Sequence, residues 1–117
     1  MNILNKQLIL AAVDLKTEDI SIPEWGGDVR VRTMTGFERD AFESTLIKGS
    51  DGRRDLTNLR ARLLAMTIVD ENGDRVFAAD DAALLGAKSA SALDQLFEVA
   101  QRLNGMGSKA EAEIEKN

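Results

Sequence analysis

The sequence predicts an α+β fold, namely a single, mainly helical domain with one or two small β-hairpins and a flexible C-terminal tail. Apolar side chains recur at helical spacing in several segments, and shorter segments alternate apolar with polar residues around turn-forming residues. Aromatic residues make up only 4% of the chain, so the core must consist of Leu, Ile, Val and Ala. This composition favours helices packed on a small sheet over a β-sandwich. The length of 117 residues suits one domain, expected over residues 1–105, followed by a polar tail over 106–117.

The composition argues against several classes of function. Without cysteine there is no disulfide framework or thiolate chemistry, and without histidine the most common general base and metal ligand are missing. A formal net charge of −5 argues against nucleic-acid binding. No apolar run approaches the roughly 20 residues that cross a bilayer, and the N-terminus lacks the features of a signal peptide. We therefore expect an intracellular protein with no cofactor, no metal and no contact with nucleic acid or membrane.

The N-terminal third predicts a helix followed by a β-hairpin. Apolar residues at helical spacing predict a short amphipathic helix over residues 4–13. Two alternating segments then flank a loop at Glu24–Gly27, whose glycines suit a tight turn. The register that gives one apolar and one charged face pairs Ile22 with Val29, Ile20 with Val31, Ser21 with Arg30, and Asp19 with Arg32.

Trp25 lies at the tip of this hairpin, and the sequence leaves two alternatives for it. The side chain covers the apolar face of the hairpin, or it contacts a partner, because tryptophan is enriched among interface hot spots.

The middle of the chain predicts two longer helices. Thr35 and Glu38 have the spacing of a capping box, which opens a helix that ends near Gly49. One side of this helix is expected to carry Phe37, Ala41, Phe42 and Leu46. After a loop at Gly49–Arg53, a second helix is expected from about Asp55 to Thr67, with an apolar stripe of Leu56, Leu59, Leu63 and Met66.

The remainder predicts a second hairpin and a last helix. Asn72-Gly73 is the favoured pair for a type I′ turn, which would join residues 68–70 to residues 75–77. A brief helix follows at Asp80–Leu85, and the last helix is expected from about Ser91 to Asn104. The apolar face of the last helix consists of Leu93, Leu96, Phe97, Ala100 and Leu103.

The residues give no pattern of a catalytic or ligand-binding site. Asp70–Asp74 resembles a calcium loop, but its glycine is at the wrong position and the twelfth residue, Asp81, is not glutamate. Gly26-Gly27 lacks the glycine spacing and the lysine of a phosphate loop. The adjacent carboxylates of Asp80 and Asp81 diverge on a helix. We therefore expect no enzyme and no catalytic, cofactor-binding or metal-binding residues.

Arginines make the helix over 55–67 locally basic. Arg60 and Arg62 do not share a helix face and have Asp51 and Asp55 close by, so a solvated face or a protein contact is favoured over phosphate binding. The candidate partner-binding residues are Trp25, Arg30, Arg32, Arg60 and Arg62.

Taken together, several segments resemble one protein family. Ile22–Gly27, Val29–Arg32 and Thr35–Glu43 are similar to the N-terminal half of the small tail assembly chaperones of long-tailed (siphovirus-type) bacteriophages or prophages. The later segments that carry the resemblance are Asn58–Leu63, Ile68–Gly73 and Leu96–Gly105. The combination is diagnostic, although no single motif is a functional signature.

The resemblance implies a non-enzymatic role in the host cytoplasm. Such chaperones bind the tape-measure protein, keep this long helical chain soluble, help recruit tail-tube subunits, and are absent from the mature virion. Self-association is also expected, because coating a long chain needs many repeated weak contacts.

The family is often made in two lengths by a programmed ribosomal frameshift. Glu115-Lys116-Asn117 can be encoded by GAA-AAA-AAC, which contains a slippery A-AAA-AAC run. A frameshifted longer form is therefore a hypothesis that the gene sequence tests.

Three other functions are compatible with parts of the sequence. The chain could be a small structural virion component, such as a head–tail connector or tail-tip protein, and composition does not separate this from a chaperone. A DNA-binding regulator would use the arginine-bearing helix, and its binding would depend on salt. An enzyme is the least favoured, since no coherent set of catalytic side chains exists.

Overall fold

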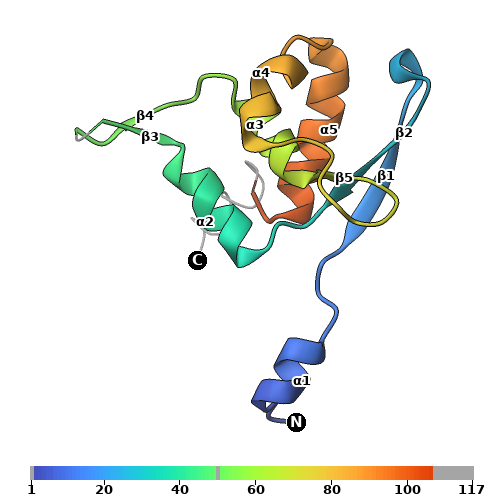
Figure 1. Cartoon of the computed structure of the whole chain (residues 1–117), viewed down its shortest axis with the longest axis vertical. Coiled ribbons are helices and arrows are strands. Elements are labelled where there is room, and N and C mark those ends of the chain that lie inside the picture. The colour runs from blue at the N-terminus through green and yellow to red at the C-terminus, as the bar shows by residue number, and fades with distance from the viewer. Residues whose placement is uncertain (1, 50, 107–117) are drawn as a thin grey trace, which may run out of the picture.

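A body of helices on a small sheet and a separate N-terminal helix make up the computed structural model, which describes residues 2–49 and 51–106. Helix α1 (Lys6–Ala11) lies away from the body at the end of an extended linker (Figure 1). The sequence predicts a flexible tail over 106–117, of which residues 107–117 lie outside the described residues. The arrangement confirms the predicted α+β fold.

The sheet has three antiparallel strands in the order β1-β2-β5. Strands β1 (Thr17–Ile22) and β2 (Gly27–Arg32) form the predicted hairpin, and β5 (Ile68–Val69) pairs with the other edge of β2. Helix α5 (Ala90–Leu103) packs against β1 and β2 and against helix α3 (Leu59–Thr67), and α3 also contacts β2. The sheet, α3 and α5 therefore enclose a common core.

The predicted register of the hairpin is wrong by two residues. Ile22 pairs with Gly27 and Ile20 with Val29, because a short 3₁₀ turn, η1 (Pro23–Trp25), closes the loop. Gly26 completes this turn with a φ of 78°, a conformation that favours glycine. A shift of two residues keeps every side chain on its own face, so Ile22 is still buried, as is Val31.

Helix α2 (Gly36–Ser44) begins at the predicted capping box. Thr35 Oγ1 accepts a hydrogen bond from the Glu38 N–H at 3.1 Å, and Glu38 Oε1 accepts one from the Thr35 N–H at 2.9 Å. The helix ends at Ser44 and not near Gly49, because β3 (Ile47–Lys48) pairs with β4 (Arg53–Arg54) in a further short hairpin.

The apolar face predicted for α2 is also wrong in part. Phe42 is buried, with 1% of its surface exposed, whereas Phe37 is 91% exposed. The two residues are five positions apart, which separates their side chains by roughly 140° around an α-helix. Only one of them can therefore face the core.

Helix α3 begins later than predicted, at Leu59, because Asn58 has a left-handed conformation with φ 56° and interrupts helical geometry. At its other end α3 leads directly into β5. The predicted second hairpin is present only as a short pairing, with a bridge between Val69 and Arg75 and a backbone hydrogen bond from the Val76 N–H to the Ile68 carbonyl oxygen. The predicted type I′ turn is wrong: that type needs a positive φ at both central residues, and Gly73 has one whereas Asn72 does not. The Gly73 N–H instead donates to the Asp70 carbonyl oxygen at 3.0 Å.

Two short helices and α5 complete the fold. The predicted brief helix consists of the 3₁₀ turn η2 (Ala79–Asp81) and α4 (Ala82–Leu85). Helix α5 begins one residue earlier than predicted, and the hydroxyl of Ser89 caps it by accepting a hydrogen bond from the Ala92 N–H. The core is aliphatic apart from one aromatic ring, as the composition predicts; its largest fully buried apolar side chains are Phe42, Ile22, Leu63, Leu64, Leu96 and Val31.

Candidate functional site

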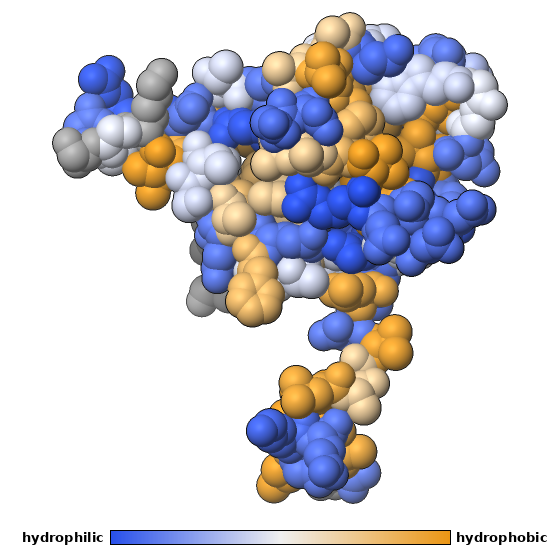
Figure 2. Space-filling model, in the orientation of Figure 1, coloured by the Kyte–Doolittle hydropathy of each residue, from blue (hydrophilic) through white to orange (hydrophobic). Residues whose placement is uncertain are grey.

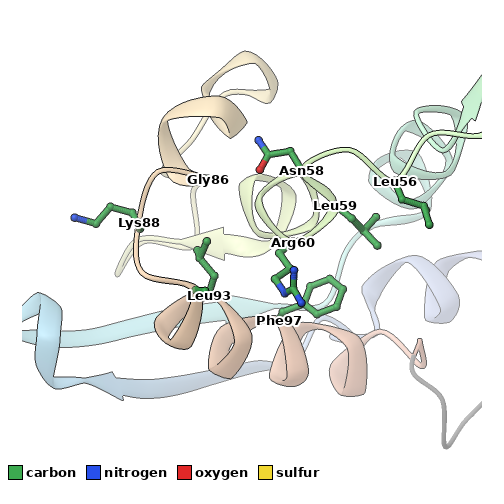
Figure 3. Close-up of a pocket in the computed structure, with 9 residues that line it drawn as sticks. Leu56, Asn58, Leu59, Arg60, Gly86, Lys88, Leu93 and Phe97 are labelled. Carbon is green, nitrogen blue, oxygen red and sulfur yellow. The ribbon is translucent and has the colours of Figure 1, made fainter.

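An open groove lies between the first turn of α3 and the N-terminal half of α5 (Figure 3). Its volume is about 360 Å³. Four large apolar side chains line it, namely Leu56, Leu59, Leu93 and Phe97, together with Ala90 and the polar Asn58, Arg60 and Lys88. Leu56 is 51% exposed in the groove although the sequence predicts it in the apolar stripe of α3. A groove that combines apolar side chains with a few polar groups is the ordinary form of a binding site.

Asn58 and Gly86 shape the end of the groove beside α4. Asn58 Nδ2 donates a hydrogen bond to the Ala82 carbonyl oxygen at 3.1 Å, which ties the start of α3 to α4. A Cβ atom on Gly86 would collide with the Asn58 side chain, so any other residue at this position would push that side chain aside. The left-handed backbone of Asn58 and the missing side chain at Gly86 together set the shape of this end.

The two cations of the groove have partners within the chain. Arg60 Nε lies 2.5 Å from Asp94 Oδ1, and the Arg60 guanidinium lies over the Phe97 ring, 5.9 Å from its centroid. The Lys88 ammonium lies 5.8 Å from the centroid of the Trp25 ring. Contacts of this kind hold a cation on an aromatic face. A segment bound in the groove would therefore contact apolar side chains, and both cations of the groove already have partners.

Trp25 is half-buried and packs against the hydrophobic core. This placement corresponds to the first alternative that the sequence leaves open, in which the ring covers the hairpin. The ring is nevertheless connected to the groove, because Lys88 both lines the groove and lies over Trp25.

The N-terminal arm, residues 2–16, carries the largest group of exposed apolar side chains in the part of the chain that the structure describes (Figure 2). No residue of α1 is buried. Leu8 is 55% exposed, Leu10 74% and Val13 96%; Ile3, Leu4, Ile9 and Leu15 are exposed as well. The predicted helix is present but shorter, over Lys6–Ala11 and not 4–13, and none of its residues is buried.

Two candidate residues, Arg30 and Arg32, lie on the sheet and outside the groove. Arg30 binds Asp19 through hydrogen bonds of 2.7 and 3.0 Å, and this contact holds the pKa of the Asp19 carboxyl below its usual range. Arg32 is more enclosed: its guanidinium lies 2.7 Å from Glu38 Oε1, and its side chain is only 16% exposed. Arg32 thus connects β2 to the capping box of α2.

Arg62, a further candidate, also holds parts of the body together. Its guanidinium donates hydrogen bonds to the carbonyl oxygens of Thr45, Asp55 and Thr57. It thereby ties the C-terminal end of α2 and the segment before α3 to α3 itself. Of the five candidates, the structure places Arg60 in the groove, connects Trp25 to it through Lys88, and leaves Arg30, Arg32 and Arg62 outside it.

Sequence reasoning missed the groove and the open arm. Leu56, Leu93 and Phe97 were assigned to apolar helix faces, and periodicity alone does not separate a buried position from one at a groove. Among residues 2–49 and 51–106, no group of three His, Cys, Asp or Glu side chains could hold a metal ion. No helix within these ranges is long and apolar enough to span a membrane.

Comparisons with a family model and with solved structures both give matches. The sequence model of a family described as "Phage tail assembly chaperone" matches residues 5–117. Among solved structures, the fold is similar to that of the bacteriophage HK97 tail assembly chaperone, with a TM-score of 0.58 and 19% sequence identity. This similarity covers 80% of the present chain and 92% of the HK97 chain. The comparison with curated proteins gives no match.

Proposed function

Because the chain belongs to the phage tail assembly chaperone family, we propose that it binds the tape-measure protein, keeps it soluble and helps to recruit tail-tube subunits. The observation that carries the proposal is the family match over residues 5–117. The chain would act in the host cytoplasm and be absent from the mature virion. This is the role that the resemblance of the sequence segments implies.

The surface of the molecule supports a role in binding proteins. The arm exposes seven large apolar side chains, and the body adds an open apolar groove. Exposed apolar surface of this extent is typical of sites that contact other proteins. A chaperone of a long helical chain needs such surface, because it must cover apolar side chains that would otherwise aggregate.

We assign different parts in partner binding to the five candidate residues. Trp25, Arg30 and Arg60 reach the surface and would contact partners directly. Arg32 and Arg62 are held by partners within the chain, so they would act by fixing the shape of the sheet and of α3. The contacts with the tape-measure protein would be numerous and individually weak, and copies of the chain would associate along it.

The family is generally non-enzymatic, and we propose that this chain acts by binding alone, with no cofactor. A longer, frameshifted form remains part of the proposal. It would be detected as a second, larger product that begins with the same sequence. A gene without the slippery run at the codons for Glu115–Asn117, and without a downstream frame, would contradict this part.

Co-expression with the tape-measure protein tests the function. We expect the tape-measure protein to be found in the soluble fraction and to co-purify with this chain, whereas without it the same protein is insoluble. An unrelated acidic protein of similar size, expressed at the same level, is the control. A tape-measure protein that stays insoluble and unbound would show that the proposed function is wrong.

A further inference from the structure

We infer that the N-terminal arm of one copy docks in the groove between α3 and α5 of a second copy. Each chain would then donate one arm and accept another. This inference rests on the self-association in the proposed function, and it does not depend on which other proteins the chain binds. It assigns the occupant of the groove and the contact that builds the assembly.

The arm needs a partner to supply packing. Helix α1 has six residues and none of them is buried, and isolated helices this short are marginal in water. Its apolar side chains, Leu8, Ile9 and Leu10 among them, are more than half exposed. The helix lies apart from the body of the same chain (Figure 1). A surface on another molecule would bury these side chains and stabilise the helix.

The side chains that line the groove suit an apolar, almost uncharged segment such as the arm. Large apolar side chains line the groove beside the polar Asn58, and its two cations are already engaged, Arg60 with Asp94 and Lys88 with the Trp25 ring. An occupant therefore gains little from carrying charge. Residues 2–13 carry only one charged side chain, that of Lys6, among six large apolar ones. An almost uncharged apolar helix is thus the complementary ligand, whereas a strongly charged segment is not.

The position of the arm favours an intermolecular contact. The arm joins the body at Thr17, and the neighbouring Glu18 is ion-paired to Arg102 near the C-terminal end of α5. The groove is lined by Leu93 and Phe97 from the N-terminal half of that helix. The linker leads α1 away from the body of its own chain (Figure 1). The arm is therefore presented to a neighbour.

Such a contact is heterologous, because each copy contributes two different surfaces. Its arm contacts one neighbour and its groove contacts another. Heterologous contacts produce rings if they close and extended chains if they do not. Either assembly would present repeated copies along a long partner, which is what coating the tape-measure protein requires.

Complementation between two variants of the full chain tests the inference. Leu8→Glu places a charge on the arm, and Leu56→Glu places one in the groove; both positions are more than half exposed, so the body should remain folded with an unchanged melting temperature. Each change should weaken self-association by roughly tenfold or more, since a buried leucine side chain is replaced by a charge. Val76→Glu, at an equally exposed apolar position outside the arm and groove, should associate like the wild type.

Light scattering and sedimentation measure the mass of each protein and of the mixture. At a concentration where the wild type assembles, each variant alone should stay near the monomer mass of 12.8 kDa. An equimolar mixture should form a heterodimer and grow no further, because one intact arm meets one intact groove. A mixture that stays monomeric, or a wild type that is monomeric at every concentration, would overturn the inference. So would a Leu56→Glu variant that assembles like the wild type, as an arm-to-arm contact predicts.

Disulfide formation gives a second, independent readout, because the natural chain has no cysteine. Separately purified Leu8→Cys and Leu56→Cys chains should form a mixed disulfide dimer on oxidation, whereas Leu8→Cys and Val76→Cys should not. Equal yields from the two mixtures would contradict the docking. These experiments use this chain alone, so their failure would leave the co-expression result with the tape-measure protein unaffected.

Discussion

Arg30 and Asp19 form a two-pronged ion pair across the β1–β2 hairpin, with Arg30 Nε 2.7 Å from Asp19 Oδ1 and Nη2 3.0 Å from Oδ2. The two residues are direct register partners. The hydrogen bonds from Arg30 are the main cause of the lowered pKa of Asp19, and the same contact raises the pKa of Arg30. The contact identifies the observed register, because the register expected from the sequence would pair Asp19 with Arg32.

Asp19 should make the free energy of unfolding depend on pH in the acidic range. On unfolding, Asp19 loses Arg30 and its pKa rises to the ordinary value, so the unfolded state binds more protons over this range. The contribution of Asp19 is therefore fully present above the usual aspartate pKa and is lost as the pH falls through the lowered pKa of the folded state. Asp19→Asn should lower stability at neutral pH and make the loss on acidification less steep.

Urea denaturation from neutrality down to roughly pH 2 measures this effect. Asp40→Asn, which removes one carboxylate at an exposed position of α2, is the control. Identical acid profiles for wild type and Asp19→Asn would contradict the assigned ion pair.

The two phenylalanines of α2 should differ sharply in their effect on stability. Phe42→Ala removes a side chain that is 1% exposed and should lower the free energy of unfolding by about 3 to 5 kcal/mol. Phe37→Ala removes one that is 91% exposed and should change it by less than about 0.5 kcal/mol. Chemical denaturation of both variants measures the two changes in the free energy of unfolding. Similar losses for the two would mean that α2 is rotated from the position described.

Substitutions of Arg62 and Arg60 should also differ in their effect on stability, although the two residues are only two positions apart. Arg62→Met leaves the backbone carbonyls of Thr45, Asp55 and Thr57 without their donor and should cost about 1 to 3 kcal/mol of stability. Arg60→Met loses an exposed ion pair with Asp94 and the contact with the Phe97 ring, and should cost less than about 1 kcal/mol. Thermal or urea unfolding compares the two. A larger loss from Arg60→Met would be the opposite of this expectation.

A side chain at Gly86 should destabilise the fold. Gly86→Ala pushes the Asn58 side chain away from the Ala82 carbonyl oxygen and should destabilise the fold by about 1 to 2 kcal/mol. Gly36→Ala is the matched control: it lies in the first turn of α2, and an added Cβ would meet no atom within 4 Å. This second change should be neutral or slightly stabilising. Equal unfolding free energies for the two variants would contradict the close packing of Gly86 on Asn58.

Those parts of the fold that a single local sequence pattern specifies could be predicted. Thr35 and Glu38 specify the start of α2 by themselves, and the apolar spacing of α5 specifies both its length and its buried face. The hairpin register could not be predicted in this way. Registers two residues apart place the same side chains on the same faces, so the hydrophobic pattern does not distinguish them. The 3₁₀ turn at Pro23–Trp25 decides between them.

The candidate site was harder to predict, because it depends on which apolar side chains of a helix are left without core residues to pack against. The spacing of Leu4 and Leu8 correctly indicates an amphipathic helix, but it does not tell whether the apolar face meets the chain's own core. Leu56 was likewise expected to continue the stripe of α3. The left-handed conformation of Asn58 instead starts the helix after it and leaves Leu56 at the edge of the groove. Such features arise from tertiary structure and have no local sequence signal.

Quantitative mass spectrometry of tail-assembly intermediates and of finished particles tests the central proposal most directly. The chain should be abundant in complexes with the tape-measure protein isolated before the tail tube forms, and it should be missing from purified mature particles. A fixed number of copies retained in mature particles would contradict an assembly chaperone and would identify the chain as a structural component of the virion.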